Sequence, residues 1–328
     1  MPRIRNKIVP VLLAGAAFFV FLPSQALARD VIDRFDFDLT GGYRVDQFDW
    51  NIAGNSEGRD PNVLSEVAWK NLKSYQVSSR AKVIMTNDSA PFGGTVRIGA
   101  SYGDIHTGYN RDSDFSGDNR TQEYSRSTNH ADSGKVWDGS LGGGLVFFNH
   151  SRTFALSPLV GYSLHQQALT IQEGYQAYSN PAITPSNTEL PAVGAIAGLN
   201  STFEAKWQSG WLGLDADYIP CQYFDLHGGV EAHYGKYESE ADWNLRGDLG
   251  HPRSFSQNSD RAMGVVSTIG MRAGIRNVLL NVDFNYQKWR VKDGEDQTYF
   301  SEGTTGVTRL NQVNWEAFSI NGGVTLRF

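Results

Sequence analysis

The chain has 328 residues, with one cysteine, 12% aromatic residues, 20% charged residues and a net charge of −6. One cysteine excludes a disulfide scaffold and a zinc site built on several cysteines. The aromatic content excludes a disordered chain, and the acidic balance argues against a nucleic-acid partner, since nucleic-acid-binding proteins usually carry a basic patch. The length allows one large β domain or two smaller domains.

The first residues have the composition of a secretory signal. Three basic residues precede a mostly apolar run from Ile8 to Leu22, and Ala26-Leu27-Ala28 is a small-x-small cleavage site. The run is shorter than the roughly 20 residues that a membrane-spanning helix needs. We therefore expect residues 1–28 to be a signal peptide and residues 29–328 to form a single domain.

After this leader, the chain is dominated by alternating apolar and polar residues, the signal of β-strands. The alternation is clear around residues 96–102, 212–218, 224–234 and 278–286. At the C-terminus, one face of the pattern carries Phe318, Ile320, Val324, Leu326 and Phe328. The pattern predicts an all-β protein, either a secreted sandwich with an apolar core or a barrel with an apolar face toward lipid.

Three features favour the outer-membrane barrel. Aromatic residues recur near the ends of the predicted strands, as in an interfacial girdle. The tryptophans concerned are Trp50, Trp69, Trp137, Trp207, Trp289 and Trp315. Connections alternate between tight and long, and the chain ends on Phe328, which resembles the terminal signal of bacterial outer-membrane proteins.

Counting the connections gives the number of strands. Tight turns are predicted near Asn87–Phe92, Asn149–Thr153, Pro220–Gln222 and Arg276–Asn277. Long loops are predicted near Ala53–Asn62, Gly108–Gly134, Glu173–Pro191, Leu245–Asp260 and Asp293–Gln312. These connections predict a ten-stranded antiparallel transmembrane β-barrel, with tight periplasmic turns and long extracellular loops, in the outer membrane of a Gram-negative-type bacterium.

A barrel of this size has a narrow lumen that side chains largely fill. The charged residues on the predicted inward faces are Asp36, Asp38, Arg80, Lys82, Arg97, Asp215, Glu231, Arg272, Asp283 and Arg327. We expect them to pair with one another and to close the lumen, in preference to lining an open pore.

The second long loop is rich in acidic residues. Asp112 and Asp114 are two residues apart and could together hold a water and take its proton. The spacing alone favours an ordinary acidic surface loop over this interpretation. The same segment nearly fits a calcium-binding loop, with ligands Asp112, Asp114, Ser116, Asp118 and Glu123. Ser116 departs from that pattern, and no helices are predicted beside it. No cofactor other than calcium is suggested.

Ten strands, five long loops and this Asp-x-Asp resemble the omptin family of outer-membrane proteases. The segments Asp49–Gly54 and Asn62–Glu66 are even more similar to an omptin-like branch, the Protochlamydia outer membrane protein type. The resemblance implies a pair of aspartates, here Asp112 and Asp114, facing an Asp–His pair across the barrel rim. Together they would activate a water to cut next to basic residues, and Asp46 would help bind the basic side chain.

The second half of this catalytic set departs from the family pattern. The fourth loop holds Asp248-Leu249-Gly250-His251, so the Asp-to-His spacing is one residue too long. Asp242 is another acid nearby, but it has no histidine two residues later. One hypothesis is therefore an omptin-type endopeptidase in which Asp248 and His251 pair in a shifted loop.

The other hypothesis is a non-enzymatic barrel that acts as an adhesin, a narrow pore or a structural protein. The expected partners are outer-membrane lipid with lipopolysaccharide, the outer-membrane assembly machinery and, for the peptidase, a basic peptide. No nucleic acid is expected. The position of His251 relative to the two aspartates discriminates between the two hypotheses.

Overall fold

A computed structural model describes residues 32–86, 90–185 and 190–328. The expected signal peptide, residues 1–28, lies outside these described residues. The regular elements of the described chain are strands and one 3-10 turn, η1 (Asp118–Arg120). None of the described residues forms a helix long and apolar enough to cross a membrane.

The strands are long and follow the chain with few interruptions. They are β1 (Ile32–Ile52), β2 (Ser65–Met85), β3 (Phe92–Gly117), β4 (Thr121–His130), β5 (Gly134–Phe148), β6 (Phe154–Ser179), β7 (Gly194–Cys221), β8 (Phe224–Asp242), β9 (Phe255–Ile275), β10 (Val278–Tyr299) and β11 (Thr305–Arg327).

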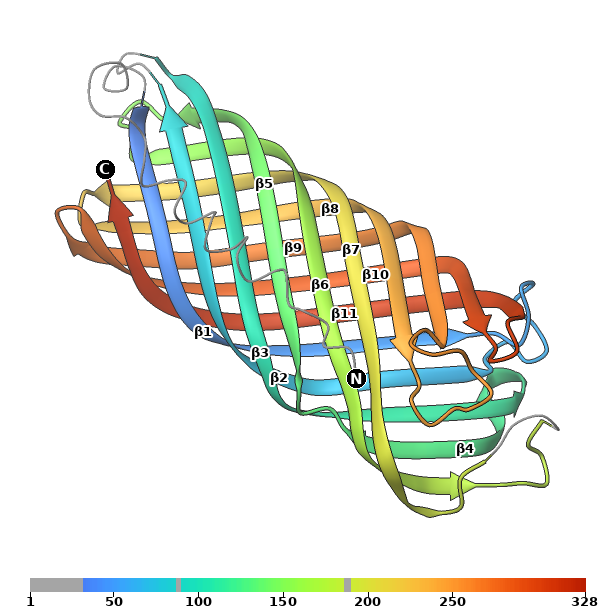
Figure 1. Cartoon of the computed structure of the whole chain (residues 1–328). Helices are drawn as coiled ribbons and strands as arrows, with labels where there is room; N and C mark the ends of the chain where they lie inside the picture. Colours follow the sequence, from blue (N-terminus) through green and yellow to red (C-terminus); the bar gives the residue numbers. More distant parts are fainter. Residues whose placement is uncertain (1–31, 87–89, 186–189) are drawn as a thin grey trace.

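These strands form one antiparallel sheet that closes into a tilted barrel (Figure 1). The first strand, β1, pairs with both β2 and the last strand, β11. β4 and β5 pair with the same two strands, β3 and β6, at successive levels. Since β4 and β5 share one position around the barrel, between β3 and β6, the eleven strands occupy the ten positions that the sequence predicts.

The connections alternate between short and long and define two ends of the barrel. Short connections join β2 to β3, β5 to β6, β7 to β8 and β9 to β10, and we call this end the turn end. The opposite end, at the lower right of Figure 1, is the loop end. Three predicted turns are confirmed, and the fourth lies partly outside the described residues, at 87–89.

The predicted loops are shorter than expected because the strands continue into them. The segment Gly108–Gly134, predicted to be a loop, consists mostly of the outer part of β3, η1 and β4. β3 and β4 pair from Tyr109 opposite His130 to Gly117 opposite Thr121. Polar residues dominate this hairpin, so the apolar alternation that marks a half-buried strand is missing there.

An apolar belt surrounds the outside of the barrel next to the turn end. Each of the ten positions contributes at least one exposed apolar side chain. Examples are Leu39, Val77, Ile98, Leu141, Val160, Leu212, Val230, Ile269, Leu280 and Ile320. Tyrosines such as Tyr75, Tyr162, Tyr234 and Tyr286 border the belt toward the loop end. A closed apolar belt of this kind is the lipid-facing surface of a transmembrane barrel.

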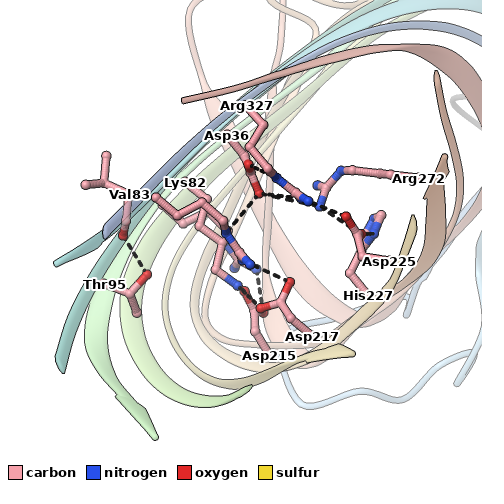
Figure 2. A network of polar contacts seen from close by, with 12 residues as sticks. Asp36, Lys82, Val83, Thr95, Asp215, Asp217, Asp225, His227, Arg272 and Arg327 are labelled. Atoms are coloured by element: carbon pink, nitrogen blue, oxygen red, sulfur yellow. Dashed lines mark hydrogen bonds and ion pairs between the residues drawn. The ribbon is translucent and has the colours of Figure 1, made fainter. Parts of the chain in front are cut away.

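Inside the belt, ion pairs fill the lumen near the turn end (Figure 2). Arg327 reaches both Asp36 and Asp225, with N–O distances of 2.7 Å to each. Arg272 lies beside them and binds Asp38 at 2.9 Å and Asp225 at 3.4 Å. All five side chains are largely buried, so each charge is compensated where water is scarce.

A second group of ion pairs continues this layer across the lumen. Lys82 lies between Asp215 at 3.2 Å and Asp217 at 2.8 Å, and Arg97 joins Asp215 to Glu231. The remaining residues predicted to face inward are paired as well, Arg80 with Asp215 and Asp283 with His227. The prediction that the inward charges pair with one another is therefore confirmed.

The half of the lumen nearest the loop end is filled by aromatic rings. Trp207, Trp289 and Trp315 are at most 1% exposed, and their ring centroids lie 5.6–5.8 Å apart. Further toward the loop end, Trp69 packs on Phe203 at 5.1 Å. These rings belong to one buried cluster, which makes this half of the barrel solid.

The prediction of a lipid-side tryptophan girdle is therefore wrong for five of its six members. The five buried inside the barrel are Trp50, Trp69, Trp207, Trp289 and Trp315. Trp137 is half-buried on the outward face, where its indole donates a hydrogen bond to Gln166 at 2.7 Å. Alternation shows which residues share a face of a strand, but it does not show which face is inside.

The polarity of the two faces is exchanged at one level along the strands. In β10, the last outward apolar residue before this level is Tyr286. The next outward residue, Lys288, is charged and exposed, and the inward residue that follows it, Trp289, is apolar and buried. β11 changes at the same level, since Lys288 pairs with Glu316 and Trp289 with Trp315. Beyond the belt, the barrel has an apolar core and a polar surface, so its loop half projects out of the lipid as a water-soluble barrel would.

Asp296 is a buried acid in this projecting half. It is 1% exposed and accepts a hydrogen bond from the Gln257 amide at 3.1 Å. Burial raises the pKa of Asp296 from 3.8 to about 7. Between those pH values the unfolded chain has lost this proton while the folded chain keeps it, so the folded state loses stability as pH rises.

We expect Asp296→Asn to remove most of this pH dependence. The native barrel should lose about 1.4 kcal/mol of unfolding free energy per pH unit across this window, and little more above it. Urea titrations of the refolded barrel at several pH values measure the slope. An equally steep slope in Asp296→Asn would contradict the assignment.

Candidate functional site

Asp112 and Asp114 lie on the inward face of β3, at the mouth of the barrel on the loop end. Their partners on β4 are Ser127 and Ser125, and both serines are buried. On the other side, β2 places Ser65 opposite Asp114. The side chains of Ser65 and Ser125 lower the pKa of Asp114. The ladder therefore holds two carboxylates next to each other on one surface of the mouth.

The electrostatics of the mouth favour protonated carboxyls. Burial raises the pKa of Asp112 well above its usual value, and the neighbouring charge of Asp114 raises it further. Burial also raises the pKa of Asp114. Tyr124 on β4 is also buried, and its burial together with the charges of Asp114 and Asp112 raises its pKa. Both carboxyls thus have the raised pKa expected of like charges placed together away from water.

The cation beside this pair is Arg246, in the segment between β8 and β9 that appears as the orange loop at the loop end of Figure 1. Its guanidinium donates two hydrogen bonds to Asp248, at 2.8 and 2.7 Å. Its charge also lowers the pKa of Asp112 and Asp114, against the effect of burial. Trp243, from the same segment, also lowers the pKa of Asp112.

His251 pairs with Asp242 and not with Asp248. The distance from His251 Nδ1 to Asp242 Oδ1 is 2.6 Å, while Asp248 is held by Arg246. The neighbouring Ala241 is buried in the apolar core, so Asp242 falls on the outward face of β8. The predicted Asp248–His251 pair is thus replaced by an Asp242–His251 pair. This pair is on the outside of the barrel wall, whereas Asp112 and Asp114 are on the inside.

Asp46, the residue expected to bind a basic side chain, lies inside the barrel. It is 1% exposed and accepts two hydrogen bonds from Arg44, at 2.8 and 2.9 Å. The indole of Trp315 donates a third, at 2.8 Å. Both carboxylate oxygens of Asp46 therefore already have partners within the aromatic core.

The expected calcium ligands other than the two aspartates are engaged elsewhere. Asp118 accepts a hydrogen bond from the backbone of Asn62 at 2.8 Å, and the Ser116 hydroxyl donates to the Gln122 carbonyl at 3.2 Å. Glu123 lies 3.6 Å from Arg126. Within the described ranges, no group of three or more histidine, cysteine, aspartate or glutamate residues could hold a metal ion.

Sequence reasoning missed Arg246 and Trp243, the two residues that complete the mouth. Both lie in or next to a predicted loop, where no periodicity indicates the direction of a side chain. It also missed the contact of His251 with Asp242, because their separation of nine residues matches no familiar motif. No signal in the sequence would have identified these contacts.

Comparisons with known proteins agree with this architecture. The family model described as Protochlamydia outer membrane protein matches residues 38–328. The outer membrane protease OmpT from Escherichia coli superposes with a TM-score of 0.70 at 11% identity, covering 90% of this chain and 97% of OmpT. The translocator domain of the autotransporter NalP from Neisseria meningitidis matches at 11% identity, with 98% and 95% coverage and a TM-score of 0.32. No curated protein matches the chain. At 11% identity, the match to OmpT shows the fold alone.

Proposed function

Because the chain belongs to the Protochlamydia outer membrane protein family, and is therefore an outer-membrane β-barrel, we propose that it is a non-enzymatic surface protein with an adhesive or structural role. The observation that carries this proposal is the position of Arg246. Its charge lowers the pKa of Asp112 and of Asp114, which makes both carboxylates weaker bases toward a water.

The placement of His251 supports the same proposal. An omptin-type mechanism needs the imidazole and the aspartate pair on either side of one water. Here the imidazole is bonded to Asp242 on the outward face of β8, and Asp112 and Asp114 are on the inward face of β3. The specificity acid, Asp46, is held by Arg44 and Trp315.

The filled lumen speaks against a pore. Ion pairs such as Arg327–Asp36 occupy the turn half, and the tryptophan cluster around Trp289 occupies the loop half. An ion crossing the barrel would have to break the first layer and displace the second. What remains is a rigid barrel whose projecting half offers loops and a polar wall for contact.

We further propose that the loop end is extracellular and that lipopolysaccharide surrounds the belt. Lys236 and Lys288 follow the belt tyrosines Tyr234 and Tyr286 on the outward face, at the level where lipid phosphates would lie. The exposed terminal Phe328 is the proposed recognition element for the outer-membrane assembly machinery.

Native Cys221 allows a test of this orientation. It is a free, exposed thiol at the turn end of β7, whereas Ser301 lies between β10 and β11 at the loop end. We expect a membrane-impermeant maleimide to label intact cells carrying Ser301→Cys in a Cys221→Ser background. Native protein should react only after the cells are permeabilised. The opposite labelling pattern would reverse the orientation.

The alternative function is an omptin-type endopeptidase, which the shared fold and the buried Asp112/Asp114 pair favour. We expect refolded protein with lipopolysaccharide to leave fluorogenic peptides with paired Arg or Lys residues intact. Cleavage that is lost in both Asp114→Asn and His251→Ala would overturn the proposal and establish the peptidase. Arg246→Gln serves as the matched variant, because it removes the cation while leaving both candidate catalytic groups in place.

A further inference from the structure

A serine inside the barrel has the partners of an activated nucleophile. The hydroxyl oxygen of Ser163 lies 3.1 Å from Nε2 of His165, and Nδ1 of His165 lies 2.7 Å from a carboxylate oxygen of Asp138. Asp138 also accepts a hydrogen bond from Arg44 at 2.5 Å. Ser163, His165 and Asp138 thus have the arrangement of a nucleophile, a base and an acid that orients the base.

A second set of the same kind meets the first. Glu231 lies 3.0 Å from Nε2 of His233, and Nδ1 of His233 lies 3.0 Å from the Ser209 hydroxyl. The Ser163 and Ser209 oxygens are 2.9 Å apart, and Ser163 is also 3.2 Å from Nδ1 of His233. Ser163 therefore contacts both imidazoles.

The hydrogen-bond partners fix where the protons are. An ionised carboxylate only accepts hydrogen bonds, so Nδ1 of His165 donates to Asp138 and Nε2 is left as the acceptor. By the same reasoning, Nδ1 of His233 is an acceptor. Nδ1 of His233 has a single lone pair, and the Ser209 hydroxyl is closer to it, at 3.0 Å, than Ser163 is, at 3.2 Å. Nε2 of His165 is therefore the base for the Ser163 proton.

This cluster lines a cavity between the ionic layer and the aromatic core. The cavity has a volume of about 200 Å³, and Ser163, His165 and His233 are among its lining residues. Trp289 packs on both imidazoles, with ring-centroid distances of 4.7 and 4.8 Å. The bases are thus fixed in position, and the cavity can hold a small molecule.

We propose that Ser163 is a nucleophile that captures small, uncharged, activated acyl donors in this cavity. The Ser163 oxygen forms a bond to the acyl carbon while its proton passes to Nε2 of His165. The bond from the acyl carbon to the leaving oxygen then breaks, and that proton leaves with the released alcohol. The product is an ester on Ser163. Charged donors are excluded because the charges that line the cavity, such as Asp138 and Glu231, already hold arginines.

The surroundings of Ser163 favour capture over rapid turnover. Its backbone pairs with Ser140 on β5 and with Ser209 on β7. The backbone N–H groups near the hydroxyl are therefore used in hydrogen bonds between the strands. A developing oxyanion would lack the backbone donors that stabilise it in acyl-transfer enzymes. The inference is independent of the mouth residues and of the proposed surface role.

The test uses the refolded native barrel and methanesulfonyl fluoride, a small electrophile that transfers a sulfonyl group to serine with release of fluoride. Mass spectrometry of the intact chain and of its peptides should show one adduct, on Ser163. Ser163→Ala should show none. His165→Asn, which removes the base, should slow labelling about 100-fold.

Ser157→Ala is the matched control, because Ser157 is a buried inward serine on the same strand and outside the cluster. It should label at the native rate. No adduct on the native barrel, adducts spread over several serines, or equal labelling in His165→Asn would each overturn the proposal. Because the adduct is mapped on native protein, a Ser163→Ala chain that fails to fold does not affect the assignment of the site.

Discussion

Trp289→Ala should destabilise the barrel by about 3–5 kcal/mol, the cost of removing a large buried aromatic side chain. Trp289 is 1% exposed and stacks on Trp315 with ring planes 16° apart. Gly264 on the neighbouring strand leaves room for it, since a Cβ at Gly264 would lie 2.5 Å from the Trp289 ring. The loss is therefore a cavity in a layer that nothing nearby can fill. Urea or guanidinium titrations of the refolded barrel measure it.

Trp137→Ala is the control for this prediction. Trp137 is half-buried on the outward face, so removing its side chain leaves no internal cavity and should cost clearly less. A girdle of tryptophans facing lipid would make the two substitutions comparable. Equal losses at Trp137 and Trp289 would therefore contradict an aromatic core inside the barrel.

Arg272→Met should have an effect of similar size, about 3–5 kcal/mol, for an electrostatic reason. Arg272 is 3% exposed and binds Asp38 at 2.9 Å, Asp225 at 3.4 Å and Asp36 at 3.7 Å. Methionine keeps much of the apolar stem but leaves these carboxylates short of a counter-charge in a buried layer. The same unfolding titrations measure the loss, and Asp38→Asn in the Arg272→Met background should recover part of it.

Arg261→Met provides the comparison for that experiment. Arg261 is 68% exposed and pairs with Asp293 at 3.3 Å on the projecting wall. An exposed pair of this kind contributes at most about 1 kcal/mol, because water and salt screen it. If Arg272→Met were as mild as Arg261→Met, the ionic layer would not stabilise the barrel.

The membrane-spanning part of the fold could be predicted in detail because its sequence obeys one rule. Residues such as Leu280 and Ile320 face lipid and alternate with inward polar residues such as Asn281 and Asn321. Two different solvents on the two faces of a strand leave a period of two that survives in the sequence. Strand number, turn positions and inward charges followed from it.

In the loop half the same period of two continues, but the apolar residues face inward and the polar residues outward. The prediction that the tryptophans there face lipid was therefore wrong. Lys288 and Trp289 still alternate, but the apolar residue is now the inward one. Nothing local to the strand records whether its apolar face meets lipid or a core. That depends on whether the surroundings are lipid or water at that height, and on rings such as Trp207 and Trp315 arriving from other strands.

The sequence by itself determined an all-β chain with ten strand positions, an apolar lipid face and inward charges, because each depends on residues close together along the chain. Only the tertiary structure decided what surrounds Asp112 and Asp114, since Arg246 reaches them from a segment more than a hundred residues away. It also moved His251 onto Asp242 and joined Ser163 to His165 and His233. Such contacts depend on barrel closure and strand register, which align side chains from several strands at one height.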